Sequence, residues 1–246
     1  MQVHDRIHIV ASGAYGCDLT HPSDCHAYLI DGGSEWAMID AGAGVDASAM
    51  VRGIAAAGVD ADRLRHALVS HAHADHAGGA AALREQFGLD VHASPEVAAI
   101  LRSGDEQAAG VDIGKAQGSY APDYVYRATE VAGELVDGDR VQVGDVTIEA
   151  IVTPGHSIGH RAYLVHSPGR RDLFTGDTLF FGGEIILQNT WDCDLRAHLD
   201  SLRHLAEHDF DGLFPGHLTF SLRRGRRHLE AALASMDRGG VPPSFG

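Results

Sequence analysis

Cysteine is scarce in this chain of 246 residues. The three cysteines, Cys17, Cys25 and Cys193, are an odd number, and they form no CxxC pair. This pattern argues against a disulfide scaffold and against a zinc site built from thiolates, and it fits a reducing compartment.

Long apolar runs and excess positive charge are also absent. No run approaches the length that spans a bilayer, and the start, MQVHDRIHIV, lacks the charged-then-apolar pattern of a signal peptide. We therefore expect a soluble, cytoplasmic protein. Because 19 Lys and Arg face 34 Asp and Glu, the formal net charge is −15. Such a surface repels phosphate backbones and anionic lipid, so we expect neither nucleic acid nor a membrane as a partner.

Short apolar runs alternate with helical patterns along most of the chain. Strands are predicted over residues 7–10, 26–30, 37–39, 67–70, 91–93, 146–152, 162–166, 172–174 and 212–214. Helices are predicted over residues 47–57, 79–87, 95–101, 195–207 and 222–236. No Pro-rich or Ser-rich linker divides the chain, so one domain, residues 1–246, is expected, with sheet packed on sheet and helices outside. Residues 103–127, rich in glycine and tyrosine, interrupt the pattern and predict a surface excursion or lid.

Histidine is abundant, with 17 residues, and four of them lie in the stretch HALVSHAHADHAGG, residues 66–79. Histidine is costly to bury without a partner, and neighbouring imidazoles repel each other when protonated. A divalent cation among the ring nitrogens accounts for such a cluster most simply.

Three further segments place a potential ligand directly after a predicted strand and a glycine. IEAIVTPGH ends in His156, DLFTGD ends in Asp177 and GLFPGH ends in His217. Loops that leave strand ends are where sites assemble in layered folds, so these side chains are expected to converge. The complete candidate set is His71, His73, Asp75, His76, His156, Asp177 and His217. Imidazole and carboxylate suit Zn²⁺, Fe or Mn, and seven ligands suit two ions that share a carboxylate better than one tetrahedral ion.

The motif H-x-H-x-D-H, followed by separate His, Asp and His, resembles that of the metallo-β-lactamase-fold hydrolase superfamily. The resemblance extends from the hairpin YLIDGGSEWAMIDAG to GLFPGH. It implies an α+β fold, an αββα sandwich of two mixed β-sheets flanked by helices, with the metals at one edge. It also implies that His71, His73 and His156 bind the first ion, that Asp75, His76 and His217 bind the second, and that Asp177 bridges them. Asp40, in IDAG, matches a position from which an acid supports the ligands; a strand-end turn residue is the alternative.

Differences between this sequence and the patterns of individual subgroups of the superfamily indicate which subgroup it resembles. Zinc β-lactamases of the main groups carry Cys at the position of Asp177, and nuclease members usually carry Gly at the position of Ala74. Glyoxalase II enzymes have an additional helical domain, whereas this sequence ends about thirty residues after His217. The resemblance is therefore to the glyoxalase II-related group that holds lactonases and thioesterases, and glutathione thioesters are not the favoured substrates.

The resulting hypothesis is a hydrolase that cleaves an ester, lactone, thioester or amide bond of a small-molecule acyl substrate by a metal-bridging hydroxide. Two divalent ions, zinc before manganese or iron, lower the pKa of bound water, and Asp75 passes the released proton to the leaving group. One alternative is a mononuclear-iron oxygenase that resembles persulfide dioxygenases. The other alternative is a non-catalytic ligand binder.

Residues that contact the substrate are harder to find in the sequence. His160 lies four positions after His156 and is a candidate for contact with the substrate, with a supporting or surface role as the alternative. Phe180, Phe181 and Trp191 follow Asp177 and are candidates for an apolar acyl pocket. Ordinary core packing is the alternative for these aromatic residues. The tyrosines of the excursion are candidates either for an oxyanion donor or for anchors of that segment: Tyr120, Tyr124 and Tyr126.

Overall fold

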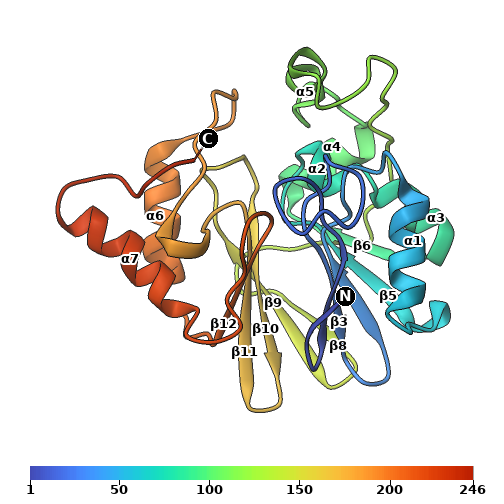
Figure 1. Ribbon diagram of the computed structural model, residues 1–246, viewed down its shortest axis with the longest axis horizontal. Coiled ribbons are helices and arrows are strands. Elements are labelled where there is room, and N and C mark those ends of the chain that lie inside the picture. Colours follow the sequence, from blue (N-terminus) through green and yellow to red (C-terminus); the bar gives the residue numbers. More distant parts are fainter. Residues whose placement is uncertain (246) are drawn as a thin grey trace.

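A computed structural model describes residues 1–245 and shows two β-sheets packed face to face between two layers of helices (Figure 1). The first sheet follows chain order and consists of β1 (Gln2–His4), β2 (Ile7–Ala11), β3 (Ala27–Asp31), β4 (Trp36–Ile39), β5 (Leu64–Leu68), β6 (Asp90–Ala93) and β7 (Gly133–Glu134). Strands β1 to β4 pair antiparallel, and β4 to β7 pair parallel.

The second sheet has the order β12-β11-β10-β9-β8 and is also mixed. Its strands are β8 (Arg140–Val143), β9 (Val146–Val152), β10 (Arg161–Ser167), β11 (Arg170–Gly176) and β12 (Gly212–Pro215). All neighbours pair antiparallel except β11 and β12, which run parallel. The expectation of two mixed sheets flanked by helices is confirmed.

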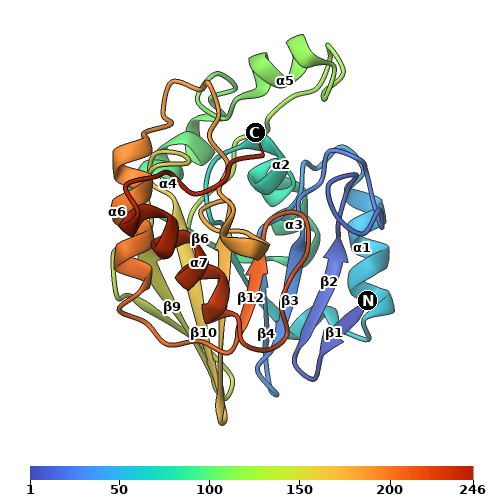
Figure 2. The ribbon, with the colours of Figure 1, turned by 60° about the vertical axis from the view of Figure 1, so that its left-hand side comes forward.

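Helices cover the outer face of each sheet. Beside the first sheet lie α1 (Ala47–Ala56), α2 (Ala74–Ala77), α3 (Ala80–Phe87), α4 (Pro95–Ser103) and α5 (Val111–Gln117), with the 3₁₀ turn η1 (Ala61–Arg63). Beside the second sheet lie α6 (Leu195–Leu205), α7 (Arg226–Asp237) and the 3₁₀ turn η2 (Phe181–Gly183), which Figure 2 brings forward. Three apolar clusters fill the interfaces, one between the sheets and one under each helical layer. Within residues 1–245, no helix combines the length and the apolar character needed to cross a membrane.

Local sequence explains where the main helices begin and end. Asp46 accepts a hydrogen bond from the Ala49 N–H at the start of α1, and Asp194 caps α6 in the same way. Ser94 caps α4, and the left-handed Gly104 ends it. These caps agree with the predicted helices at those positions to within two residues.

Two expectations about the elements need correction, and five short elements come in addition. The predicted helix over residues 222–236 begins only at Arg226, because Arg224 adopts a left-handed φ of +57° and Gly225 packs directly on the backbone of Gly212. The predicted strand over residues 67–70 covers Leu64–Leu68 instead, because the Ser70 N–H binds a side chain and not the sheet. The short elements β1, β7, β8, α2 and α5 were not predicted, since each is too short for a clear periodicity.

The excursion over residues 103–127 contains α5 and stands above the edge of the first sheet (Figure 1). Its tyrosines fasten it to the body of the protein. The Tyr124 hydroxyl donates to the Ala43 carbonyl at 2.7 Å, and the Tyr126 hydroxyl donates to the Ala72 carbonyl at 3.1 Å. These contacts support the anchoring alternative for Tyr124 and Tyr126, whereas movement of the excursion as a lid stays a prediction.

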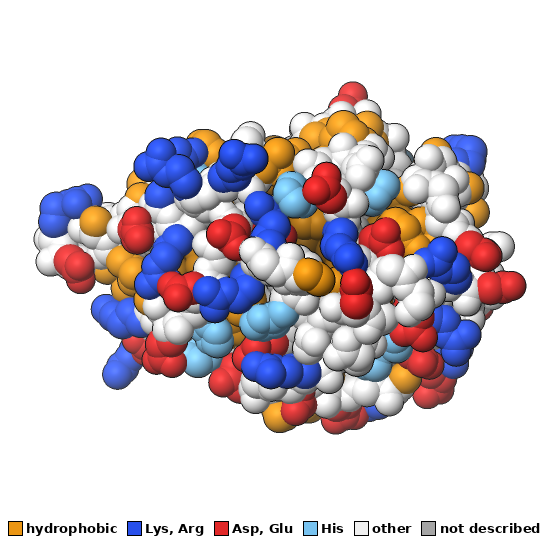
Figure 3. All heavy atoms as spheres, turned by 90° about the horizontal axis from the view of Figure 1, so that it is seen from below, with side chains coloured by type: hydrophobic (Ala, Val, Ile, Leu, Met, Phe, Trp, Pro, Cys, Tyr) orange, Lys and Arg blue, Asp and Glu red, His pale blue; other side chains and the backbone are white. Residues whose placement is uncertain are grey.

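The opposite end of the molecule carries charged side chains of both signs. Figure 3 looks at that end, where Lys and Arg side chains are interspersed with Asp and Glu, and several histidines lie among them. On this face the acidic side chains are therefore mixed with basic ones and do not form one block of like charge.

Phe174 provides a test of the interface between the sheets. It is buried, its ring lies 4.9 Å from Phe214 and 5.0 Å from Tyr28, and Phe174→Ala should lower the free energy of unfolding by about 3–5 kcal/mol. Urea unfolding measures the change. The control Phe181→Ala removes a ring that is 37% exposed, so a loss as large as that of Phe174→Ala would contradict this account.

Candidate metal centre

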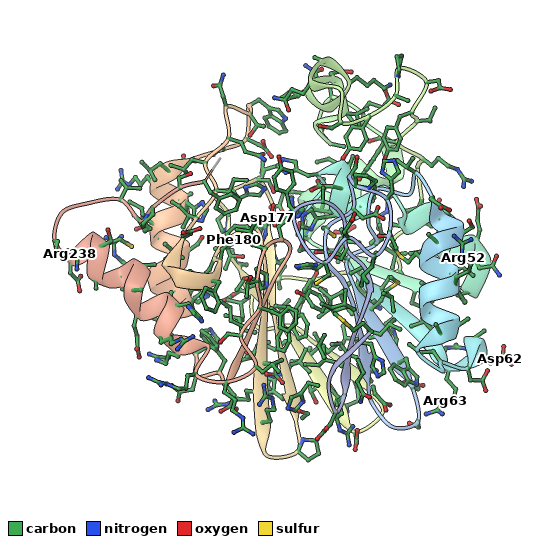
Figure 4. All side chains as sticks on the ribbon, viewed as in Figure 1. Arg52, Asp62, Arg63, Asp177, Phe180 and Arg238 are labelled. Carbon is green, nitrogen blue, oxygen red and sulfur yellow. The ribbon has the colours of Figure 1, made fainter. Side chains whose placement is uncertain are left out.

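The seven predicted ligands come together at one edge of the sandwich, on the loops that follow four strands. The segment after β5 carries four of them, and the loops after β9, β11 and β12 carry one each. Figure 4 labels Asp177 at this edge, above the strands. Gly216, just before His217, allows the close approach, because a Cβ there would overlap both His76 and Asp177.

A first group consists of three buried histidines, His71, His73 and His156. One ring nitrogen from each lies within 4.8 Å of the others. His156 Nε2 is 3.0 Å from His73 Nδ1. His71 Nε2 is buried and has no hydrogen-bond partner among the described residues. Three nitrogens that face one point, one of them unpaired, fit the ligands of a metal ion.

A second group consists of Asp75, His76 and His217. His217 Nε2 lies 3.1 Å from Asp75 Oδ2 and 3.2 Å from His76 Nε2. Asp75 and His76 stand next to each other on the short helix α2, so their side chains reach this group from successive positions. This set also matches a metal-ligand cluster.

Asp177 lies between the two groups. Its Oδ1 is 3.4 Å from His76 Nε2, and its Oδ2 is 3.6 Å from both His156 Nε2 and His217 Nε2. The carboxylate is buried, and Oδ1 has no hydrogen-bond partner within residues 1–245. A carboxylate in this place can contribute an oxygen to each group.

The donor set itself tests whether a cation fits. Two imidazole nitrogens that face each other at 3.0–3.2 Å need either a shared proton or a cation between them. The cluster also holds orphaned buried atoms, His71 Nε2 and Asp177 Oδ1, which a cation would satisfy. The residues present therefore fit divalent metal ions.

Asp40 supports the second group from behind. Its φ of +60° is left-handed, and its Oδ2 accepts from His76 Nδ1 at 2.8 Å. The Ser70 N–H and hydroxyl donate to the same carboxylate at 2.7 and 2.8 Å. The Ser70 Oγ also lies 3.0 Å from His71 Nδ1. Asp40 and Ser70 thus orient two rings so that their Nε2 atoms face the cluster.

Asp192 plays a similar part for His73, and sequence reasoning missed it. Its Oδ2 lies 3.8 Å from His73 Nε2, the nitrogen that points away from the cluster, and its side chain is almost fully buried. Asp192 also accepts from the Ile158 N–H at 3.2 Å. No motif surrounds Asp192, so only the fold reveals the contact.

His160 lies behind the ligands and does not reach the cavity. Its Nε2 accepts from the Asp177 N–H at 3.1 Å, while Nδ1 faces the hydroxyls of Thr153 and Thr178 at 2.8 and 3.1 Å. Its ring stacks on His71 with centroids 5.0 Å apart. Burial lowers the pKa of His160 well below its usual value. The contacts make His160 a neutral support for Asp177.

The aromatic candidates for an acyl pocket lie elsewhere. Phe180 is fully buried, with its ring 4.7 Å from that of Phe245, and Figure 4 shows it toward the α6–α7 layer. Phe181 packs on His228 with centroids 4.2 Å apart, and Trp191 is 62% exposed. None of these three is among the residues that line the cavity described next.

A cavity of about 1680 Å³ opens directly over the cluster. Its floor includes the candidate ligands His73, Asp75, Asp177 and His217. Its walls come from the loop around Tyr15, from the excursion and from the segment after η2. The cavity is large enough for a small-molecule ligand to reach the cluster.

Burial and neighbouring charge divide the histidines into two kinds. Burial, followed by the adjacent imidazoles, lowers the pKa of His71 well below its ordinary value, and burial lowers the pKa of His156 to about 3. Burial also opposes protonation of His76 and His217, but acidic neighbours outweigh it and raise both pKa values: Cys25, Asp177, Asp75 and Asp40 for His76, and Asp177 and Asp75 for His217. Without a metal, protons are therefore held mainly beside the aspartates.

An αββα sandwich with buried histidines and aspartates at one edge defines a class of metal-binding proteins. A model of the metallo-beta-lactamase superfamily matches residues 21–217, and the chain belongs to this family. The predicted resemblance is confirmed.

Curated relatives are named hydroxyacylglutathione hydrolase. The protein of Rhodopseudomonas palustris is 31% identical over 138 residues, which cover 56% of this chain and 43% of the relative. The protein of Thermosynechococcus vestitus is 33% identical over 144 residues, which cover 58% of this chain and 46% of the relative. The match spans less than half the length of each of these relatives.

Solved structures show the same fold. A metallo-beta-lactamase of Cronobacter sakazakii with a HARLDQ motif superposes with a TM-score of 0.69 at 23% identity, over 97% of this chain and 86% of that one. BJP-1, a subclass B3 metallo-beta-lactamase of Bradyrhizobium japonicum, gives a TM-score of 0.68 at 21% identity, over 100% of this chain and 85% of that one.

Asp40→Asn tests the support of the second group. The amide keeps the size of the side chain but removes the charge that accepts from His76, so zinc affinity should fall roughly 10–100-fold. Competition with a chromophoric chelator measures the affinity. The control Asp31→Asn changes an aspartate at the end of the neighbouring strand β3, and equal losses in the two variants would contradict the assignment.

The raised pKa values of His76 and His217 predict that metal binding depends on pH. A metal needs neutral imidazole, and these rings hold protons above the usual range, so zinc must displace protons. Affinity should rise with pH, by up to about tenfold per pH unit for each proton displaced, and level off above the raised pKa values. Chelator competition between pH 6 and pH 9 measures this; a flat profile would be the opposite result.

Proposed function

We propose that the protein is a metal-dependent hydrolase that cleaves an ester, lactone, thioester or amide bond of a small molecule. The observation that carries the proposal is the position of Asp177, buried between two groups of three ligands and within 3.6 Å of a nitrogen from each. A site with this donor set is typical of two ions that share a carboxylate. The relatives named hydroxyacylglutathione hydrolase support the same class of reaction.

Under this proposal, His71, His73 and His156 hold one ion, and Asp75, His76 and His217 hold the other, with Asp177 between them. Divalent ions, zinc first, would supply Lewis acidity and would lower the pKa of water toward neutrality. The chain contributes the orientation of its ligands through Asp40, Ser70 and Asp192, each of which contacts the far side of a ring.

Asp75 is proposed to handle the proton. Its side chain lines the cavity, and Oδ2 accepts from His217 Nε2 at 3.1 Å. Burial favours the neutral acid, but His76 and His217 outweigh it and lower the pKa of Asp75 to about 2. Asp75 is therefore ionised at neutral pH, and it can accept a proton from water and return it to the leaving group.

Metal content and turnover together test the proposal. Plasma mass spectrometry of the purified protein should find about two equivalents of zinc, manganese or iron per chain. Removal of the metal with a chelator should abolish hydrolysis of a panel of lactones, thioesters and amides, and zinc should restore it. Unchanged turnover after complete removal would refute the proposal, and a reproducible single iron with oxygen uptake on a persulfide would favour an oxygenase.

A further inference from the structure

Exposed apolar side chains gather around the cavity above the ligand cluster. Five large hydrophobic residues that line it are each at least 38% exposed: Tyr15, Val45, Ile113, Val125 and Phe245. They come from four separate parts of the chain, and Figure 1 shows α5 and the C-terminal end on opposite sides of this edge. Exposed apolar patches of this kind mark surfaces that bind apolar ligands.

The same walls offer almost no positive charge. Lys115 is the only lysine of the chain and the only Lys or Arg among the described lining residues. Its Nζ donates to Glu106 Oε2 at 2.9 Å, so its charge is already paired. The acidic residues Asp24 and Asp123 line the cavity as well, and Asp123 is exposed. Away from the metal ligands, the walls therefore oppose an anion.

From these observations we infer that the cavity takes a neutral acyl substrate with an apolar chain of several carbons, and selects against substrates that carry carboxylates far from the scissile bond. The inference rests on the proposed hydrolase and names its substrate class. Glutathione, which carries two carboxylates and one ammonium group, would place negative charge against walls whose only described Lys or Arg, Lys115, is already paired. An alkyl chain would bury the exposed faces of Ile113 and Val125.

Binding of thioethers, which cannot be hydrolysed, tests the inference independently of turnover. By calorimetry, S-octyl-N-acetylcysteamine should bind at least tenfold more tightly than S-octylglutathione, which carries the same chain. Affinity for the neutral series should rise from ethyl to octyl, by at most about fourfold per methylene. Equal or tighter binding of S-octylglutathione, or affinity independent of chain length, would overturn the inference.

Two matched valine variants test where the alkyl chain of the ligand binds. Val125 lines the cavity and is 62% exposed, whereas Val136 is 52% exposed and does not line it. Val125→Asp should weaken binding of the octyl ligand about tenfold, and Val136→Asp should leave it unchanged. Because both side chains are exposed, neither variant should disturb folding, which circular dichroism verifies. Equal effects of the two variants would place the alkyl chain elsewhere and overturn the inference.

Glu106→Gln should strengthen binding of the anionic ligand, S-octylglutathione. The amide can still accept from the Tyr126 N–H, as Glu106 does at 3.2 Å, but it no longer neutralises Lys115. The preference for the neutral thioether should therefore shrink several-fold. An unchanged preference would show that charge at the wall does not discriminate.

The corresponding octanoyl thioesters separate this inference from the proposed function. Faster hydrolysis of octanoyl-N-acetylcysteamine than of octanoylglutathione by the zinc-loaded protein supports both. Tight, selective thioether binding without hydrolysis of any thioester, lactone or ester would refute the hydrolase, yet it would still identify the ligand class of the cavity.

Discussion

The packing of five imidazoles and two carboxylates at one edge of the sandwich is the constraint on which the rest of the structure depends. Buried ring nitrogens that face each other at 3.0–3.2 Å need either a shared proton or a cation between them, and two protonated rings would repel each other. A divalent cation resolves both problems at once. The four strand ends, the close approach at Gly216 and the surrounding polar contacts all serve to hold these rings at that separation.

The supporting contacts link the fold to the chemistry. Strand β5 ends at Leu68 because the Ser70 N–H turns to Asp40, and that same carboxylate accepts from His76. Similarly, the His160 ring accepts a hydrogen bond from the Asp177 backbone N–H and thereby fixes Asp177. In each case a backbone N–H binds a side chain and not a neighbouring strand or loop, and this hydrogen bond orients a candidate ligand. In a metal site, such contacts determine which ring nitrogen is free to bind the metal. They thereby tune the affinity for the metal and the basicity of the ring.

The sequence indicated the seven candidate ligands more clearly than it indicated their surroundings. Two local patterns indicate them: the spacing of His71, His73 and His76, and the Gly-His or Gly-Asp ends of three strands. Local patterns can be recognised in the sequence without knowledge of the fold. Asp192 reaches His73 only because the chain folds back across the edge, so no local signal marks it. The same applies to Phe180, which follows Asp177 closely in sequence but is fully buried against the ring of Phe245. Short elements such as α2 and β7 depend on tertiary pairing and not on periodicity.

The candidate ligands and the walls of the cavity above them come from different parts of the chain. All seven candidate ligands lie within the residues that match the family, 21–217. The cavity walls, in contrast, include Tyr15 and Phe245, which lie outside that range, and residues of the excursion between β6 and β7. Under the proposed function, the ions would bind the reacting group and the walls would bind the remainder of the substrate, so one ligand set could act on different molecules when its walls change. For this reason the substrate of this chain has to be sought in its cavity walls and not in its candidate ligand set.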